Sequence, residues 1–291
     1  MRHLTLSLAC LAILFCNYRS AAQDTLWGVT ENQFLVSWDA ASPENLLSGT
    51  AISGLQNNEQ ILGIDFRPEN NLIYAVGSSN QLYTIGLDGT ATTVGPSFSI
   101  GLDGSSFGYD FNPTIDRSRI DTNTNNNYVV NPNDGGITQV ADVFYPNGDA
   151  NFGADPNISH IAYTNSVSGA TSTQLFGIDT GLDLLVTQAN SQGTLGTVGH
   201  LGIDITEIGG FDIAGVSGIA YGAFQSTSKS RSSFYTLDLS TGSTTLIGEV
   251  GGGSLITALT VQSTVVPEPS ALLGMVAVSI CLMSRRRTSN R

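Results

Sequence analysis

Residues 63–94 read as four short strands: G-I-D-F (Gly63–Phe66), L-I-Y-A-V (Leu72–Val76), Q-L-Y-T-I (Gln81–Ile85) and A-T-T-V (Ala91–Val94). The four runs are rich in Val, Ile, Tyr, Phe and Thr. Gly, Asn, Asp and Ser residues separate them, which is typical of β-strands joined by turns. No stretch of the central region has the period of a capped amphipathic helix. The sequence therefore predicts a four-stranded unit.

The first phrase of this unit recurs along the chain, as G-Y-D-F at Gly108, H-I-A-Y at His160 and G-F-D-I at Gly210. Successive starts differ by 45, 52 and 50 residues. Four-stranded units of this length are typical of β-propeller blades. Residues 23–264 hold about five of them, so we predict an all-β propeller of about five blades. A sandwich, a β-solenoid or another all-β repeat is the alternative.

The two ends of the repeat region complement each other. Leu26–Val29 reads as the second strand of a blade that lacks its first strand, and Leu255–Val261 is a strand without a blade. We expect the last strand to become the innermost strand of the first blade. This pairing would close the ring and remove an exposed sheet edge.

The N-terminal residues are typical of a secretory signal peptide. Arg2 is followed by an apolar run of 13 residues, Leu4–Cys16, and then by the small residues Ser20, Ala21 and Ala22. We therefore expect a signal peptide at 1–22, the repeat domain at 23–262, and a linker and tail at 263–291.

The tail has three parts. Pro267, Glu268 and Pro269 form an extended segment, because proline restricts its own φ and the residue before it. The next apolar run, Ser270–Ser284, has 15 residues. As a helix it would span roughly 22 Å, which is a short transmembrane span. The positive-inside rule keeps the arginines that follow it, Arg285, Arg286 and Arg287, in the cytoplasm.

This three-part tail resembles the PEP-CTERM sorting signal of Gram-negative bacteria. The resemblance implies that the exported protein is held briefly in the inner membrane until an exosortase cuts near Pro267–Pro269. It also implies an association with exopolysaccharide and a final location at the cell surface or in the extracellular matrix. Pro267, Glu268 and Pro269 would be the processing signal and not a site of the protein's own activity, and Arg285, Arg286 and Arg287 would belong to the same sorting signal.

Cysteine and charge exclude several classes of site and partner. Cys10, Cys16 and Cys281 lie in the predicted signal and tail, so the domain has neither disulfides nor zinc–thiolate sites. Residues 23–264 hold five basic and 23 acidic residues, a net charge of −18. Nucleic acid is therefore not expected as a partner, because phosphate binding requires basic side chains.

Asp65, Asp110 and Asp212 occupy the same place in three repeats, whereas the fourth repeat has H-I-A-Y. In a propeller they would lie on innermost strands around the axis. Three hypotheses follow: hydrogen bonds to the backbone of a neighbouring blade, a cation site with Ca²⁺ as the candidate ion, or the acid and base of a glycosidase. A residue repeated in register is usually structural, and the first hypothesis is preferred.

Arg67, Arg117 and Arg119 follow the inner strands, and we expect them to pair with neighbouring carboxylates, with contact to an anionic sugar as the alternative. Residues 121–125 read D-T-N-T-N like the start of a calcium loop, but Pro132 stands where the bidentate acid should be. A solvated turn is therefore expected there.

The remaining candidates are single aromatic or imidazole side chains. His160 and His200 have no partner at ligand spacing, and no catalytic or phosphate-binding motif is present. Trp27 and Trp38 both fall in the first blade, where a core position is expected and a sugar-stacking platform is the alternative.

The domain also resembles an uncharacterised bacterial family, a domain of unknown function that often precedes PEP-CTERM tails. The matching phrases are Gly63–Pro68, Phe107–Arg119 and Gly209–Ile213, within residues 26–261. The resemblance brings no activity with it. We therefore expect a non-enzymatic structural or interaction protein of the envelope or matrix, without a required cofactor. A carbohydrate- or calcium-binding module is the alternative, and a glycoside hydrolase the third hypothesis.

Overall fold

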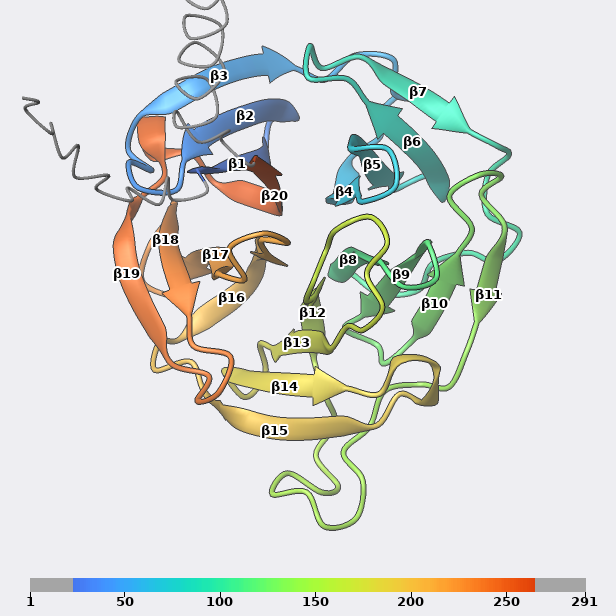
Figure 1. Ribbon diagram of the computed structural model, residues 1–291, viewed down its shortest axis with the longest axis vertical. Coiled ribbons are helices and arrows are strands. Elements are labelled where there is room, and N and C mark those ends of the chain that lie inside the picture. The colour runs from blue at the N-terminus through green and yellow to red at the C-terminus, as the bar shows by residue number, and fades with distance from the viewer. Residues whose placement is uncertain (1–22, 265–291) are drawn as a thin grey trace, which may run out of the picture. The chain divides into compact units, whose positions relative to one another are not determined.

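The computed structural model describes residues 23–264, in which twenty strands form five antiparallel four-stranded sheets. The sheets stand as blades around a common axis (Figure 1). The predicted five-bladed β-propeller is confirmed, and the sandwich and solenoid alternatives do not apply. Within the described residues the helical elements are two 3-10 turns, Asn190–Gln192 and Gly251–Gly253.

Four of the blades are meanders, with the first strand next to the axis and the fourth at the rim (Figure 1). Blade 2 consists of β4 (Ile61–Arg67), β5 (Leu72–Gly77), β6 (Gln81–Ile85) and β7 (Ala91–Val94), and blade 3 of β8 (Phe107–Asn112), β9 (Arg117–Thr122), β10 (Asn127–Val130) and β11 (Ile137–Gln139). Blade 4 consists of β12 (Ile158–Tyr163), β13 (Leu175–Asp179), β14 (Leu184–Gln188) and β15 (Leu195–His200), and blade 5 of β16 (Ile205–Ile213), β17 (Ala220–Ser226), β18 (Ser232–Leu237) and β19 (Thr244–Glu249).

Blade 1 joins the two ends of the described chain. Its strands are β1 (Gln23–Thr30), β2 (Phe34–Asp39), β3 (Leu46–Ala51) and, innermost, β20 (Ile256–Thr264). β20 pairs antiparallel with β1, and Leu26 lies opposite Val261. This is the closure that the sequence predicted. It covers the inner edge of β1, which would otherwise present unpaired backbone groups.

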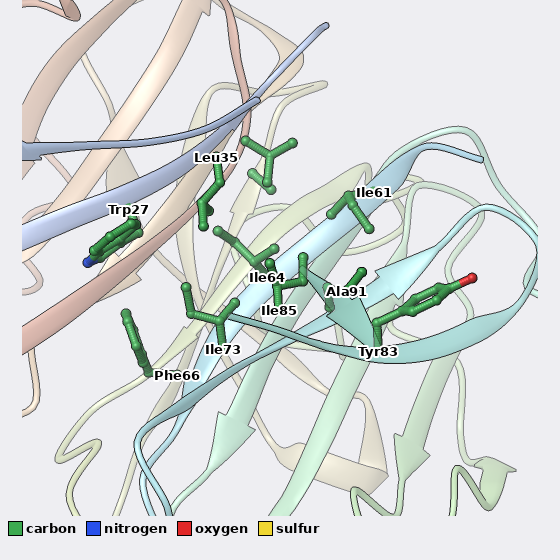
Figure 2. Close-up of a cluster of buried hydrophobic side chains, with 12 residues drawn as sticks. Trp27, Leu35, Ile61, Ile64, Phe66, Ile73, Tyr83, Ile85 and Ala91 are labelled. Carbon is green, nitrogen blue, oxygen red and sulfur yellow. The ribbon is translucent and has the colours of Figure 1, made fainter. Parts of the chain in front are cut away.

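The hydrophobic core lies between neighbouring blades. Figure 2 shows one of its clusters, in which Trp27 and Leu35 of blade 1 face Ile64, Ile73 and further side chains of blade 2. Burying an aliphatic or aromatic side chain of this size stabilises a fold by roughly 1.5–3 kcal/mol. Because the domain has no cysteine, such clusters hold the ring together without disulfides.

The inner strands approach one another closely at the axis. A Cβ atom added to Gly63 would lie 2.5 Å from Tyr109 Cβ in the next blade. One added to Gly108 would lie 2.8 Å from the backbone nitrogen of Ile161. Glycine is required at these positions because no side chain fits between the backbones. The space left at the axis is a cavity of only about 20 Å³, which suffices for one water molecule.

Candidate functional site

One position on each inner strand forms a ring around the axis. It is two residues after Gly63, Gly108 and Gly210, and after His160 and Ala258 in the two copies without glycine. It holds Asp65 in β4, Asp110 in β8, Ala162 in β12, Asp212 in β16 and Thr260 in β20. The structure therefore brings the three aspartates singled out by the sequence into one cluster. It also adds Thr260, which comes from the strand that closes the ring.

At four of these five positions the side chain accepts a hydrogen bond from the backbone of the next blade. The hydrogen bonds are Phe111 N–H to Asp65 Oδ2 (2.9 Å), Tyr163 N–H to Asp110 Oδ1 (3.2 Å), Val261 N–H to Asp212 Oδ2 (2.7 Å) and Phe66 N–H to Thr260 Oγ1 (3.1 Å). In each case the donor is the residue that follows the ring position of the next blade. The side chains therefore satisfy buried N–H groups at the inner edge of the neighbouring blade.

Ala162 interrupts the pattern because its side chain has no acceptor. The N–H group that it would have bonded, that of Ile213, instead donates to Asp212 Oδ1 at 2.5 Å. A further bond ties the ring at its closure, since Thr260 Oγ1 donates to Asp65 Oδ1 at 2.8 Å. The preferred hypothesis for the three aspartates, bonding to the backbone of a neighbouring blade, matches these contacts.

The three carboxyl groups also interact with one another. One oxygen atom of each lies within 4.8 Å of the others, and the residues are only 1–3% exposed. Burial raises the pKa of Asp65 and of Asp110 well above the ordinary range, and it raises the pKa of Asp212 to about 6. A hydrogen bond between Asp110 and Asp212 raises the pKa of the first and lowers that of the second. Asp110 therefore keeps its proton more readily and donates it in the hydrogen bond to Asp212.

This geometry limits the chemistry of the cluster. Three buried negative charges are very costly, so the cluster must hold protons or a cation. Oxygen ligands of this kind suit Ca²⁺. A glycosidase instead needs two carboxyl groups across an accessible cleft, whereas these three are buried and accept backbone hydrogen bonds. None of them lines the axial cavity, which is bordered by the residues that precede them on the strands.

The three arginines that the sequence singled out all donate hydrogen bonds to neighbouring polar groups. Arg67 forms the expected ion pair with Asp116, donating from Nε to Oδ1 at 2.7 Å. Arg119 is 3% exposed and donates to the Tyr163 hydroxyl at 2.8 Å, so it lies in a buried polar network. Arg117 donates to the backbone carbonyl of Asp116. Arg67 and Arg119 are both buried, so neither of them is accessible to an anionic sugar.

The expected solvated turn is found only over residues 123–125, because Asp121 and Thr122 still belong to β9 and are buried. Asp121 itself ends inside the protein, where burial raises its pKa to about 6. Asn123 accepts the N–H groups of Ser105 and Ser106 through Oδ1.

The Trp and Tyr side chains among the described residues offer no platform for a sugar. Trp27 and Trp38 are 7% and 0% exposed, so their expected core positions are confirmed. Every tyrosine among the described residues is also buried. Stacking on an exposed Trp or Tyr is therefore not possible within residues 23–264.

The sequence missed one polar group of residues, at the mouth of the axis. Glu31 and Gln33 come from the turn between β1 and β2, Glu207 from the start of β16, and His160 from β12. For His160 the repeat contained a signal, because His stands where the other copies have glycine. Glu207 carried none, since the β-bulge that positions it has no local sequence signature.

The sorting-signal residues lie outside the described residues, as does the predicted signal peptide. These are Pro267, Glu268, Pro269, Arg285, Arg286 and Arg287. Among residues 23–264, no helix has the length and apolar character that a membrane span requires.

Comparison with known proteins shows the family. No curated protein matches the chain. Residues 34–260 match the family described as Domain of unknown function (DUF4394), and this range covers all five blades except β1 and the last residues of β20. The match spans most of the chain, and the protein belongs to the DUF4394 family.

Proposed function

We propose that the protein is a non-enzymatic structural or interaction module, exported to the cell surface or the exopolysaccharide matrix of a Gram-negative bacterium. The observation that carries this proposal is the closed ring, in which the axial carboxylates bond neighbouring blades. These aspartates were the strongest candidates for chemistry, and their burial argues for a structural role. The net charge of −18 over residues 23–264 also suits a long-lived soluble surface.

The proposed route uses the two ends of the chain. The signal peptide exports the protein, and the tail holds it in the inner membrane until an exosortase cuts near Pro267, Glu268 and Pro269. The support is the three-part sequence of the tail. The partner on arrival would be exopolysaccharide or another matrix component.

Cell fractionation tests this route. The full chain is expressed in a Gram-negative host that has an exosortase, together with Glu268→Ala and with the control Glu44→Gln, an exposed change in the propeller. We expect the wild type and the control to reach the surface or medium in a shortened form. Glu268→Ala should remain at full length in the inner membrane. Equal release of all three proteins would refute the sorting role of the tail.

A second candidate function is calcium binding. Three carboxylate oxygen atoms within 4.8 Å of one another favour it, since Ca²⁺ is bound by several oxygen ligands. Isothermal titration of the EDTA-treated protein with CaCl₂ tests this function. Binding that Asp110→Asn abolishes would support it, and the absence of heat at millimolar Ca²⁺ would exclude it.

A further inference from the structure

The inner strands all end at one side of the ring, here called the C-face. The hydrogen bonds between neighbouring blades place equivalent positions of these strands side by side, so the strands run in the same direction. In blades 2 to 5 a loop follows the inner strand there, and the four loops are residues 68–71, 113–116, 164–174 and 214–219. A pocket of about 250 Å³ on this face is lined by residues of four blades, among them Phe66, Val167, Val216 and Val261.

The loop of blade 4 reaches across the end of the axis (Figure 1). Ser168 Oγ donates to Glu69 Oε2 at 3.0 Å, although the two residues belong to blades 4 and 2. A Cβ atom added to Gly215 of blade 5 would lie 2.1 Å from the Ser166 carbonyl oxygen. The loop therefore contacts the loops of two other blades, and the centre of the C-face is one surface.

Four blades each expose an aliphatic side chain on the C-face. These side chains are 38–57% exposed, and they are Leu72 at the start of β5, Ile115, Val167, and Val216 with Ile219. Exposed apolar side chains that share one surface are typical of a contact with a protein or a membrane.

The same four loops carry little charge. Residues 164–174 and 214–219 contain no Asp, Glu, Lys or Arg, although the whole domain has a net charge of −18. The charged residues of the other two loops are Glu69, which accepts the Ser168 hydroxyl, and Asp116, which is paired with Arg67. The centre of the C-face therefore presents mainly apolar and uncharged polar groups.

The chain leaves the propeller at this face. β20 ends at Thr264, three residues beyond Val261, which lines the pocket of the C-face. Gln23, the first residue of β1, pairs with Thr264. Both ends of the described chain therefore lie at the C-face.

Only a short linker separates the propeller from the apolar run of the predicted anchor. Residues 265–269 bridge at most about 20 Å when fully extended, and the headgroup layer takes up roughly 5–8 Å of that reach. A domain of this size has a radius of gyration of about 18 Å, so it is wider than the linker is long. A tail inserted in the membrane would therefore keep the C-face at the bilayer and the opposite face away from it.

We propose that the C-face rests on the surface of the inner membrane while the tail holds the protein there, with its exposed aliphatic side chains among the lipid headgroups. The inference rests on the proposed anchoring and names the surface that the anchored protein presents to lipid. The tether supplies a high effective concentration of membrane. The aliphatic side chains then favour this orientation, because contact with the interface removes their apolar area from water.

The tether is needed because the domain as a whole is acidic. A membrane that contains anionic lipid repels negative charge, so the free domain is not expected to bind it strongly. The central loops of the C-face add little to this repulsion. After cleavage near Pro267–Pro269 the contact would be lost, which agrees with the proposed release.

The test measures which face of the anchored protein lies at the lipid. The full chain, with Cys10, Cys16 and Cys281 replaced by serine, is reconstituted in vesicles of phosphatidylethanolamine and phosphatidylglycerol. The vesicles also contain a phosphatidylcholine that carries a nitroxide on its headgroup. A fluorophore is attached to single cysteines on the C-face, Ile115→Cys or Val216→Cys, and the nitroxide quenches it where it is close.

Two exposed aliphatic residues elsewhere supply matched controls. Leu246 on β19 is 56% exposed, like Ile115 at 57%, and Ile208 of β16 is 39% exposed, like Val216 at 44%. Ile208 lines the pocket at the opposite end of the axis. We expect quenching at both C-face positions to be at least twofold stronger than in Leu246→Cys and Ile208→Cys.

Flotation of the vesicles separates the two ways in which the proposal can fail. If the chain does not float with the vesicles, both the proposed anchoring and this inference are overturned. If it floats but the four positions are quenched equally, or the controls more strongly, the inference alone is wrong. A thermal midpoint equal to that of the wild type shows that each variant is folded. Leu72→Cys, on the same face, replaces a C-face variant that fails this check, with the same expected quenching.

Discussion

Asp110→Asn is expected to make the stability of the propeller far less dependent on pH. In the protein, Asp110 accepts a hydrogen bond from the Tyr163 N–H at 3.2 Å and is hydrogen-bonded to Asp212. An asparagine keeps both bonds, because its oxygen accepts and its NH₂ group donates. It cannot ionise, however. The variant therefore reproduces the protonated form of Asp110 at every pH.

The magnitude follows from the raised pKa of Asp110. Burial raises this pKa well above the ordinary 3.8, and the charges of Asp65 and Asp212 add to the effect. A carboxyl group whose pKa is higher in the folded state than in the unfolded state makes its full contribution to the free energy of unfolding at pH values below its unfolded pKa. Its contribution falls as the pH rises toward the folded pKa, because the unfolded chain releases the proton first. The loss is about 1.4 kcal/mol for each pH unit that lies between the unfolded and the folded pKa.

The assay is urea unfolding in EDTA at pH 4, 6 and 8, followed by the fluorescence of the buried Trp27 and Trp38. At pH 4 the free energies of unfolding of the wild type and Asp110→Asn should agree within about 1 kcal/mol. At pH 6 the variant should be the more stable protein, by up to about 3 kcal/mol, while Glu44→Gln should follow the wild type throughout. A variant that is less stable than the wild type at pH 8 would refute the reasoning, because a proton would then not be what neutralises the cluster.

Three further substitutions test the ring and its closure by the same unfolding measurement. Thr260→Val should lower the free energy of unfolding by about 1–3 kcal/mol, because the buried N–H of Phe66 loses its acceptor; an unchanged midpoint would contradict this. Gly63→Ala should cost about 1–3 kcal/mol, since the new Cβ would lie 2.5 Å from that of Tyr109. The control Gly49→Ala on β3, whose nearest neighbouring atom is 3.6 Å away, should stay within about 0.5 kcal/mol. Deletion of residues 256–264 should abolish the cooperative transition, because β20 pairs with β1 and contacts β4 and β16; a cooperative transition in the deletion variant would show that closure is dispensable.

Local patterns in the sequence were sufficient for the architecture. The strands of blade 2 follow the alternating runs between Gly63 and Val94, because alternation and turn residues are properties of neighbouring positions. The recurrence of the first phrase of the repeat, at intervals of 45, 52 and 50 residues, indicated how many blades there are. The two incomplete ends predicted closure, since an unpaired strand at each end can only be satisfied by the other.

The roles of individual side chains depended on contacts across blades. No local pattern shows that Asp65 accepts the N–H of Phe111, 46 residues away, or that Thr260 completes the same ring. The burial that raises the pKa of Asp110 likewise arises only when five inner strands meet.

The sequence by itself determined the propeller, its closure, its acidity and the lack of cysteine in the domain, because these follow from composition and from patterns a few residues long. Only the tertiary structure decided that the aspartates bond neighbouring blades, that the tryptophans are buried, and that Glu207 and His160, from different blades, line one cavity. Those outcomes require the register between blades and a bulge in β16. Both are set by packing between segments that are far apart in the chain.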